Sequence, residues 1–267
     1  MKNLNKKTVV VTGAKGLIGN ALVDSLITNK CKIIAIDKLF DSSDSVQEYL
    51  TEKNYEDLIC YGVDILDEGQ FSEKIHEGLE KFGQIHGLVN CAAIDFLPES
   101  QSSDTVEQLN IANFEEVMNI NVSGQVLCSK VIGKIMIENG TKGSIINIGS
   151  IYGKVSPKQE IYSHIKTDEG VYKKPLVYSV SKSALTNMSK YLATYWGENE
   201  IRVNNVVLGG ILNNQDEIFI KNYSKNVPLG RMANIEESIE PILFLLSDSS
   251  TYITGTDLIV DGGWTAW

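Results

Sequence analysis

The chain has 267 residues, of which 43% are hydrophobic and 22% are charged, so it is long enough to bury a core as one large or two small globular domains. Its formal net charge of −10 repels phosphate backbones and argues against nucleic-acid binding. No apolar run reaches membrane-spanning length, so no membrane partner is expected.

The four cysteines, Cys31, Cys60, Cys91 and Cys128, are widely spaced and include no Cys-x-x-Cys pair. This spacing argues against a zinc knuckle or a disulfide framework and fits a reducing cytosol. The apolar run after the basic N-terminus is too short for a signal peptide. We therefore expect a cytoplasmic protein without a metal site.

A glycine-rich turn joins the first predicted strand to the first predicted helix. Residues 8–12 are a β-branched run typical of a buried strand, and residues 20–27 have helical periodicity. Between them, Gly13 would permit a tight turn, and Gly16 and Gly19 would permit close approach to a pyrophosphate and of helix to strand. The helix N-terminus would then face the phosphates. The alternative is a purely structural turn.

An acidic residue, Asp37, ends the second predicted strand, 18 residues after Gly19. A carboxylate at this place can accept hydrogen bonds from the adenosine ribose and repels a 2′-phosphate, which favours NAD over NADP. Lys15 and Lys38 lie nearby and would weaken that repulsion, so NADP stays an alternative cofactor. Asp37 could also be an ordinary loop residue.

Strands and helices keep alternating as far as Ser150. Strands are predicted at 58–63, 85–90 and 143–150, helices at 46–53, 71–82 and 115–138, and a loop at 95–113. The alternation predicts a parallel, doubly wound sheet. Ser150 ends a central strand, at the edge where such sheets bind ligands.

Residues 151–177 are the least regular part of the chain and contain five lysines and three tyrosines. Loops of this length are unusual unless they are functional or mobile. We interpret the segment as a substrate lid whose lysines and tyrosines meet a polar or phosphorylated ligand. A solvated insertion and an interface arm are the alternatives.

Tyr178 and Lys182 lie four residues apart on a helix predicted at 175–198, so they share one face. A nearby cation favours the phenolate and lowers the pKa of a tyrosine, which can then exchange a proton near neutral pH. The alternative is a surface pair on an amphipathic helix.

The remainder of the chain completes the predicted sheet. Strands are expected at 201–208 and from Asp257, with a helix at 235–246 that contains Pro241. Because the chain contains no linker, repeat or low-complexity segment, residues 1–267 are predicted to form one α/β domain with about seven strands.

The landmarks stand in a fixed order and together resemble the short-chain dehydrogenase/reductase family from about Thr8 to Gly263. They are Thr-Gly-x-x-Gly-x-x-Gly, Asp37, Asp64, Asn-Cys-Ala-Ala, Asn121, Ser150, Tyr178-x-x-x-Lys182, Arg-Val-Asn and Val-Asp-Gly-Gly. The resemblance implies a single-domain Rossmann-type fold and NAD(P)-dependent interconversion of a secondary alcohol and a ketone.

The resemblance also implies roles for four catalytic residues. Tyr178 would be the general acid/base, and Lys182 would lower its pKa and hold the nicotinamide ribose. Ser150 would hydrogen-bond the substrate oxygen and stabilise developing charge. Asn121 would hold a water that links Lys182 to a proton relay.

The resemblance implies a cofactor cleft as well, in which Asp64 and Ile65 border the adenine, Asn90 and Ala92 line the cleft, and Ile211 meets the carboxamide. The expected cofactor contacts are Gly13, Lys15, Gly16, Leu17, Ile18, Gly19, Asp37, Asp64, Ile65, Asn90, Ala92, Tyr178, Lys182, Gly209 and Ile211.

The sequence departs from the family pattern at several positions. Leu17 replaces a glycine, Cys91 and Ala93 change the Asn-Asn-Ala-Gly motif, Leu208 replaces a proline, and Asn213 replaces a threonine. Ser150 and Tyr178 are also 28 residues apart, farther than in most members.

The long insert, with Ser-Pro-Lys in it, resembles a subgroup associated with bacterial surface-sugar and flagellar-glycan biosynthesis, which implies a sugar or sugar phosphate as substrate. An extended-branch epimerase or dehydratase, suggested by the Gly16 spacing, is disfavoured because the chain ends just past Val-Asp-Gly-Gly. A non-catalytic dinucleotide-binding regulator is disfavoured because all four catalytic positions are filled.

The family further implies a homodimer or homotetramer built on helices 115–138 and 177–198.

Overall fold

The computed structural model describes residues 3–95, 105–167 and 170–267. Its centre is a seven-stranded parallel sheet with the order β3-β2-β1-β4-β5-β8-β9. The doubly wound, Rossmann-type fold predicted from the alternation of elements is confirmed. The strands are β1 Thr8–Thr12, β2 Lys32–Ile36, β3 Leu58–Tyr61, β4 Gly87–Asn90, β5 Ser144–Ser150, β8 Arg202–Leu208 and β9 Asp257–Val260.

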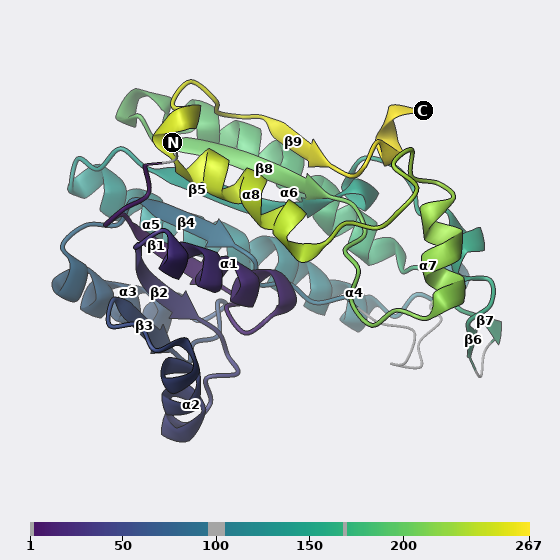
Figure 1. Ribbon diagram of the computed structural model, residues 1–267, viewed down its shortest axis with the longest axis horizontal. Helices are drawn as coiled ribbons and strands as arrows, with labels where there is room; N and C mark the ends of the chain where they lie inside the picture. Colours follow the sequence, from purple (N-terminus) through teal and green to yellow (C-terminus); the bar gives the residue numbers. More distant parts are fainter. Residues whose placement is uncertain (1–2, 96–104, 168–169) are drawn as a thin grey trace.

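Helices cover both faces of this sheet, and each face has its own hydrophobic core (Figure 1). Successive residues of β1 point to opposite faces, so Val9 and Val11 pack into one core and Val10 into the other. One face carries α1 (Leu17–Thr28), α2 (Ser43–Lys53) and α8 (Ile235–Leu246), and the other carries α3 (Glu68–Phe82), α5 (Gln125–Glu138) and α6 (Leu176–Tyr195).

The helix predicted at 115–138 begins earlier and is not uniform. It consists of α4 (Ile111–Met118), a π-helical stretch (Asn119–Gly124) and α5. The side chain of Asn110 starts α4 by accepting a hydrogen bond from the backbone N–H of Ala112 at 2.9 Å. The predicted loop at 95–113 is therefore partly helical, and its residues 96–104 lie outside the described residues.

The stretch Ile111–Glu138 is long and apolar enough to cross a membrane by length and composition alone. However, 56% of its most apolar window is buried inside the fold, and Val131, Ile132 and Met136 belong to one of the two cores. The packing is that of a core helix, and its hydrophobicity is explained by the sheet that it covers.

The predicted irregular segment 151–177 is folded against a helix that the sequence analysis missed, α7 (Glu217–Ser224). The segment contains two 3₁₀ turns, Ile151–Gly153 and Gln159–Tyr162, and a short hairpin of β6 (Lys166–Thr167) and β7 (Gly170–Val171). Figure 1 shows this hairpin beside α7 at one end of the molecule.

A chain of aromatic rings holds the segment to α7. The ring of Tyr162 lies 5.5 Å from those of Tyr172 and Phe219, Phe219 lies 5.9 Å from Tyr223, and Tyr223 stacks on Trp264 at 4.5 Å. Because these rings form a third buried cluster, the segment is a packed wall, and the alternative of a solvated insertion is wrong.

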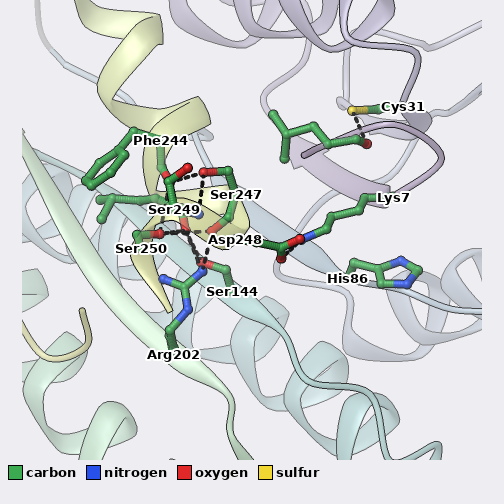
Figure 2. A network of polar contacts seen from close by, with 12 residues as sticks. Lys7, Cys31, His86, Ser144, Arg202, Phe244, Ser247, Asp248, Ser249 and Ser250 are labelled. Carbon is green, nitrogen blue, oxygen red and sulfur yellow. Dashed lines mark hydrogen bonds and ion pairs between the residues drawn. The ribbon is translucent and has the colours of Figure 1, made fainter. Parts of the chain in front are cut away.

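The carboxyl end of α8 is anchored to the sheet by Arg202 and Ser144 (Figure 2). The Arg202 guanidinium donates hydrogen bonds to the carbonyls of Leu245 at 2.7 Å and Ile253 at 3.3 Å, and the Ser144 hydroxyl donates to Leu245 at 2.9 Å. The hydroxyl of Ser250 also donates to Leu245, at 3.0 Å. The last carbonyls of a helix lack intrahelical donors, and these side chains supply them.

Replacing Arg202 by methionine should therefore destabilise the protein by about 2–3 kcal/mol, because carbonyls of Leu245 and Ile253 lose a charged donor. Urea unfolding followed by circular dichroism measures the change. Arg231→Met is the matched control: Arg231 pairs with Glu237 on the surface, so its loss should be much smaller. Equal losses in the two variants would contradict the anchoring role.

Candidate active site

Two cavities lie at the carboxyl ends of the strands, where β1 and β4 mark the reversal of strand order. The larger, of about 830 Å³, is lined by Ser150 and Tyr178 among others. The smaller, of about 210 Å³, is lined by Gly13, Asp37 and Ala92 among others. This edge of a doubly wound sheet is where ligands bind.

Ser150, Tyr178 and Lys182 are brought together beside the larger cavity. Ser150 ends β5, and its hydroxyl oxygen accepts a hydrogen bond from the backbone N–H of Tyr152 at 3.2 Å and is hydrogen-bonded to Tyr178. The Nζ of Lys182 lies 5.7 Å from the centre of the Tyr178 ring and donates to the carbonyl of Ile148 at 2.8 Å. The four-residue spacing thus places both side chains at one site, as predicted.

A glycine that the sequence analysis did not single out lets α6 approach this site. A Cβ atom on Gly153 would lie 2.7 Å from the backbone carbonyl of Lys182. The hydroxyl of Ser183 also donates a hydrogen bond to the Gly153 carbonyl at 3.1 Å. The turn after Ser150 can therefore lie directly against the helix that carries Lys182.

Asn121 lies in the π-helical stretch and is fully buried. Its side-chain oxygen accepts from the backbone N–H of Ile94 at 2.8 Å, and its amide donates to the Ile94 carbonyl at 2.9 Å and to Ser181 at 3.3 Å. It therefore joins the segment after β4 to α6 next to Lys182. The role of Asn121 in holding a water stays a prediction.

The pKa of Tyr178 is raised above its ordinary value, so the expectation of a lowered pKa is wrong for this arrangement. Burial is the largest cause, the charge of Asp95 adds to it, and the hydrogen bond with Ser150 acts in the opposite sense. Burial also lowers the pKa of Lys182 to about 8. Burial and the charge of Asp95 therefore set the direction in which the pKa of Tyr178 shifts.

The cofactor-side turn requires glycine at two positions. Gly13 has a φ of +66°, and a Cβ atom there would lie 2.7 Å from the backbone of Ala92. A Cβ atom on Gly19 would lie 2.1 Å from the carbonyl oxygen of Gly13. Gly16 is the N-cap of α1, and Leu17 and Ile18 form its first turn. A helix N-terminus preceded by such a turn offers backbone N–H groups to a phosphate.

Asp37 is 8% exposed and lines the smaller cavity. Its two carboxylate oxygens accept hydrogen bonds from the backbone N–H groups of Lys15 and Leu39, both at 2.9 Å. A carboxylate has about four acceptor sites, so two remain for ribose hydroxyls. Asp64 and Ile65 line the same cavity, as expected for residues that border an adenine.

Seven of the expected cofactor contacts, all within the described residues, line neither cavity: Lys15, Leu17, Ile18, Gly19, Asn90, Lys182 and Ile211. The amide of Asn90 is fully buried and donates to Ser129 at 3.1 Å and Asn147 at 2.8 Å, so it ties β4 to its neighbours. Ile211 forms a β-bridge with Ala233. Gly209, in contrast, lines the larger cavity.

The larger cavity also contains an ion pair that the sequence analysis missed. Lys174 pairs with Asp95, 79 residues away, and the Nζ of Lys174 lies 4.4 Å from the centre of the Tyr178 ring. Neither residue belongs to a motif, so only their position in the cavity identifies them. Among the described residues, no three His, Cys, Asp or Glu side chains gather as a metal site would require.

The pKa of Lys182 gives a prediction for stability. Folded Lys182 has a pKa of about 8, and the unfolded value is 10.5, so between these values the unfolded chain binds more protons and stability rises with pH. Relative to Lys182→Met, the free energy of unfolding of the wild type should increase by about 2 kcal/mol from pH 7 to pH 10. Urea titrations at both pH values measure it, and a constant difference would contradict the burial argument.

Comparisons with known proteins agree with the family resemblance of the sequence motifs. A family model described as "Enoyl-(Acyl carrier protein) reductase" matches residues 13–265. Post-translational flagellin modification protein A of Campylobacter coli is 30% identical over 264 residues, covering 98% of this chain and 99% of that protein. A 2,5-dichloro-2,5-cyclohexadiene-1,4-diol dehydrogenase of Sphingobium indicum is 29% identical over 273 residues, covering 100% of both.

A solved short-chain dehydrogenase from Leptospira borgpetersenii with bound NAD⁺ is 32% identical to this chain. It superimposes with a TM-score of 0.84 over 98% of this chain and 94% of that one. The range matched by the family model contains the glycine turn, Asp37, Ser150, Tyr178 and Lys182. The chain therefore belongs to the short-chain dehydrogenase/reductase family and is an oxidoreductase.

Proposed function

We propose that the protein interconverts a secondary alcohol and a ketone, with NAD as the hydride carrier and Tyr178 as the general acid/base. The observation that carries this proposal is the placement of Ser150 and Tyr178 on one cavity, with the Lys182 ammonium behind the phenol. A substrate oxygen between the two hydroxyl groups would be within reach of both.

In the reductive direction, Tyr178 donates its proton to the ketone oxygen, and the hydroxyl of Ser150 stabilises the negative charge that develops there. The raised pKa of Tyr178 keeps the phenol protonated at neutral pH, which suits a general acid. In the oxidative direction the phenolate accepts the proton of the alcohol. The nicotinamide, when bound, supplies or accepts the hydride and carries positive charge in its oxidised form.

The residues on the smaller cavity fit a dinucleotide. The turn at Gly13 leaves no room for a Cβ atom, and Asp37 keeps acceptor sites for two ribose hydroxyls while its charge opposes a 2′-phosphate. The ammonium of Lys15 donates a hydrogen bond to the carbonyl of Leu39 at 3.1 Å, which directs it toward the backbone after Asp37. These contacts support a preference for NAD, as does the NAD⁺ bound to the similar Leptospira protein.

The cofactor proposal predicts that the wild type binds NADH at least tenfold more tightly than NADPH, measured by nucleotide fluorescence titration. Asp37→Ser should narrow this ratio by improving NADPH binding, because it removes the charge that repels the 2′-phosphate. Asp24→Asn, which changes an acid of α1 that pairs with Lys53, serves as the control and should leave the ratio unchanged. Tighter binding of NADPH by the wild type would overturn the argument from Asp37.

The larger cavity supports a sugar or sugar derivative as substrate. Its lining combines aromatic rings, including Tyr152, Tyr162 and Phe219, with the side-chain amides of Asn213 and Gln215. Aromatic faces pack against the apolar faces of a polyhydroxylated ring, and amides bond its hydroxyl groups. The names of the two relatives, a flagellin modification protein and a cyclic-diol dehydrogenase, are in keeping with this class.

Residues 151–177 supply much of the substrate-side wall, and we propose that they act as the substrate lid. His164 pairs with Asp216 at 3.0 Å and Lys158 donates to Asn226 at 2.8 Å, so the segment and α7 would move together. An interface arm stays the alternative. A cytoplasmic location and a homodimer or homotetramer also stay predictions.

Tyr178→Phe should lower NAD-linked turnover by at least a hundredfold, because it removes the proton that is exchanged with the substrate oxygen. Turnover is followed as NADH production from the best alcohol in a panel of sugars and sugar phosphates. NADH binding should change less than twofold. Tyr191→Phe, on the exposed face of the same helix, should retain activity. Full activity of the Tyr178→Phe variant would contradict the proposed role of Tyr178 as general acid/base.

A further inference from the structure

The ion pair of Asp95 and Lys174 occupies the part of the cavity nearest the reacting phenol. The Nζ of Lys174 bonds to Oδ2 of Asp95 and lies 4.4 Å from the centre of the Tyr178 ring. The Lys174 side chain is 9% exposed and that of Asp95 is 28% exposed. Both residues line the cavity, so a substrate that reaches Tyr178 passes beside them.

The backbone at both Asp95 and Lys174 is held in position by the side chain of another residue. Asn121 forms two hydrogen bonds with the backbone of Ile94, which immediately precedes Asp95. Gln159 does the same for Lys174: its amide donates to the Lys174 carbonyl at 3.2 Å and its oxygen accepts from the Lys174 N–H at 2.9 Å. The pair is therefore fixed in place before a substrate arrives, which reduces the entropy lost on binding.

The two oxygens of the Asp95 carboxylate have different surroundings in the described part of the chain. Oδ2 is paired with Lys174, whereas Oδ1 is buried and receives no hydrogen bond from the described part of the chain. The Asp95 side chain as a whole is 28% exposed, so its exposed part lies outside Oδ1. A carboxylate oxygen has two acceptor sites, so Oδ2 could accept a hydrogen bond from a ligand hydroxyl beside its bond to Lys174, whereas a phosphate or carboxylate group would be repelled.

The charged side chains that line the cavity also favour a ligand that has hydroxyl groups and no phosphate or carboxylate group. Among the described lining residues, the cations are Lys166 and Lys174 and the anions are Asp95 and Asp216. These charges cancel, and the lysine nearest Tyr178 is already neutralised by Asp95. The cavity therefore favours an uncharged, hydroxyl-rich molecule over a sugar phosphate.

We propose that Asp95, held by Lys174, is a specificity-determining residue that accepts a hydrogen bond from a second hydroxyl group on the ring whose alcohol is oxidised. The substrate is thus an uncharged cyclic polyol. This inference rests on the proposed function, because it assumes that the alcohol reacts at Tyr178. A site built to bond a hydroxyl discriminates strongly against the analogue that lacks it.

The test compares cyclohexanol with the 1,2-, 1,3- and 1,4-cyclohexanediols as probes, with NAD⁺ as the oxidant that becomes NADH. The ratio of kcat/KM for the best diol to that for cyclohexanol should be at least tenfold in the wild type. In Asp95→Ala this ratio should fall close to one, whatever the absolute rates. Lys174→Met should lower it too, because Asp95 loses its support.

A surface ion pair between α5 and α3, Lys130 with Glu68, gives the matched control. Lys130→Met removes a lysine that is paired in the same way but lies away from the cavity, and it should leave the ratio unchanged. Thermal melting and NADH titration check that each variant is folded. If Asp95→Ala does not fold, Asp95→Asn replaces it and should also lower the ratio.

The inference would be overturned if the wild type had equal kcat/KM values for diols and cyclohexanol. It would also be overturned if the ratio of these values were the same in Asp95→Ala as in the wild type. Either result would leave the proposed function intact. No oxidation of any probe by the wild type would count against the proposed function instead. Binding then decides the inference: the best diol should quench the fluorescence of bound NADH with a Kd at least tenfold lower in the wild type than in Asp95→Ala. Equal Kd values would overturn it.

Discussion

The arrangement of this site depends on the burial of a lysine. Lys182 is 4% exposed, and its ammonium is held by the Ile148 carbonyl of a central strand and by proximity to the Tyr178 ring. Removing an ammonium group from water is unfavourable unless such partners are provided. The close approach of α6 to the turn at Gly153 and the central position of β5 together provide them, so the surrounding fold maintains a locally unfavourable arrangement that the reaction can use.

The two halves of the site are built in different ways. The cofactor half follows from one local unit, a strand, a glycine turn and a helix, to which Asp37 adds a carboxylate from the next strand. The half around the larger cavity is assembled from segments far apart in the chain, since its wall combines Tyr162 and Tyr172 with α7. Its charged pair joins Asp95 to Lys174. In the proposed function, the first half holds the dinucleotide and the second half contacts the substrate.

Motifs with local geometry could be read from the sequence. Gly13 and Gly19 sit where only glycine fits, and the spacing of Tyr178 and Lys182 places both on one helix face whatever surrounds it. Sequence reasoning was weaker where a helix is short or interrupted. It missed α7, although Asp216 before Ile218 and Phe219 was a usable capping signal. It also placed the start of the helix near 115 too late, although Asn110 was a usable N-cap for a helix that begins at Ile111.

The sequence by itself determined the alternation of strands and helices in the main sheet, the glycine turn, and the placement of Tyr178 and Lys182 on one helix face, because each of these depends on residues close together in the chain. The tertiary structure decided the direction in which the pKa of Tyr178 shifts, since burial and the charge of Asp95 come from distant segments. It also decided that residues 151–177 pack as a wall and that Asp95 meets Lys174. Desolvation and ion pairing depend on distance in space, which sequence separation does not reveal.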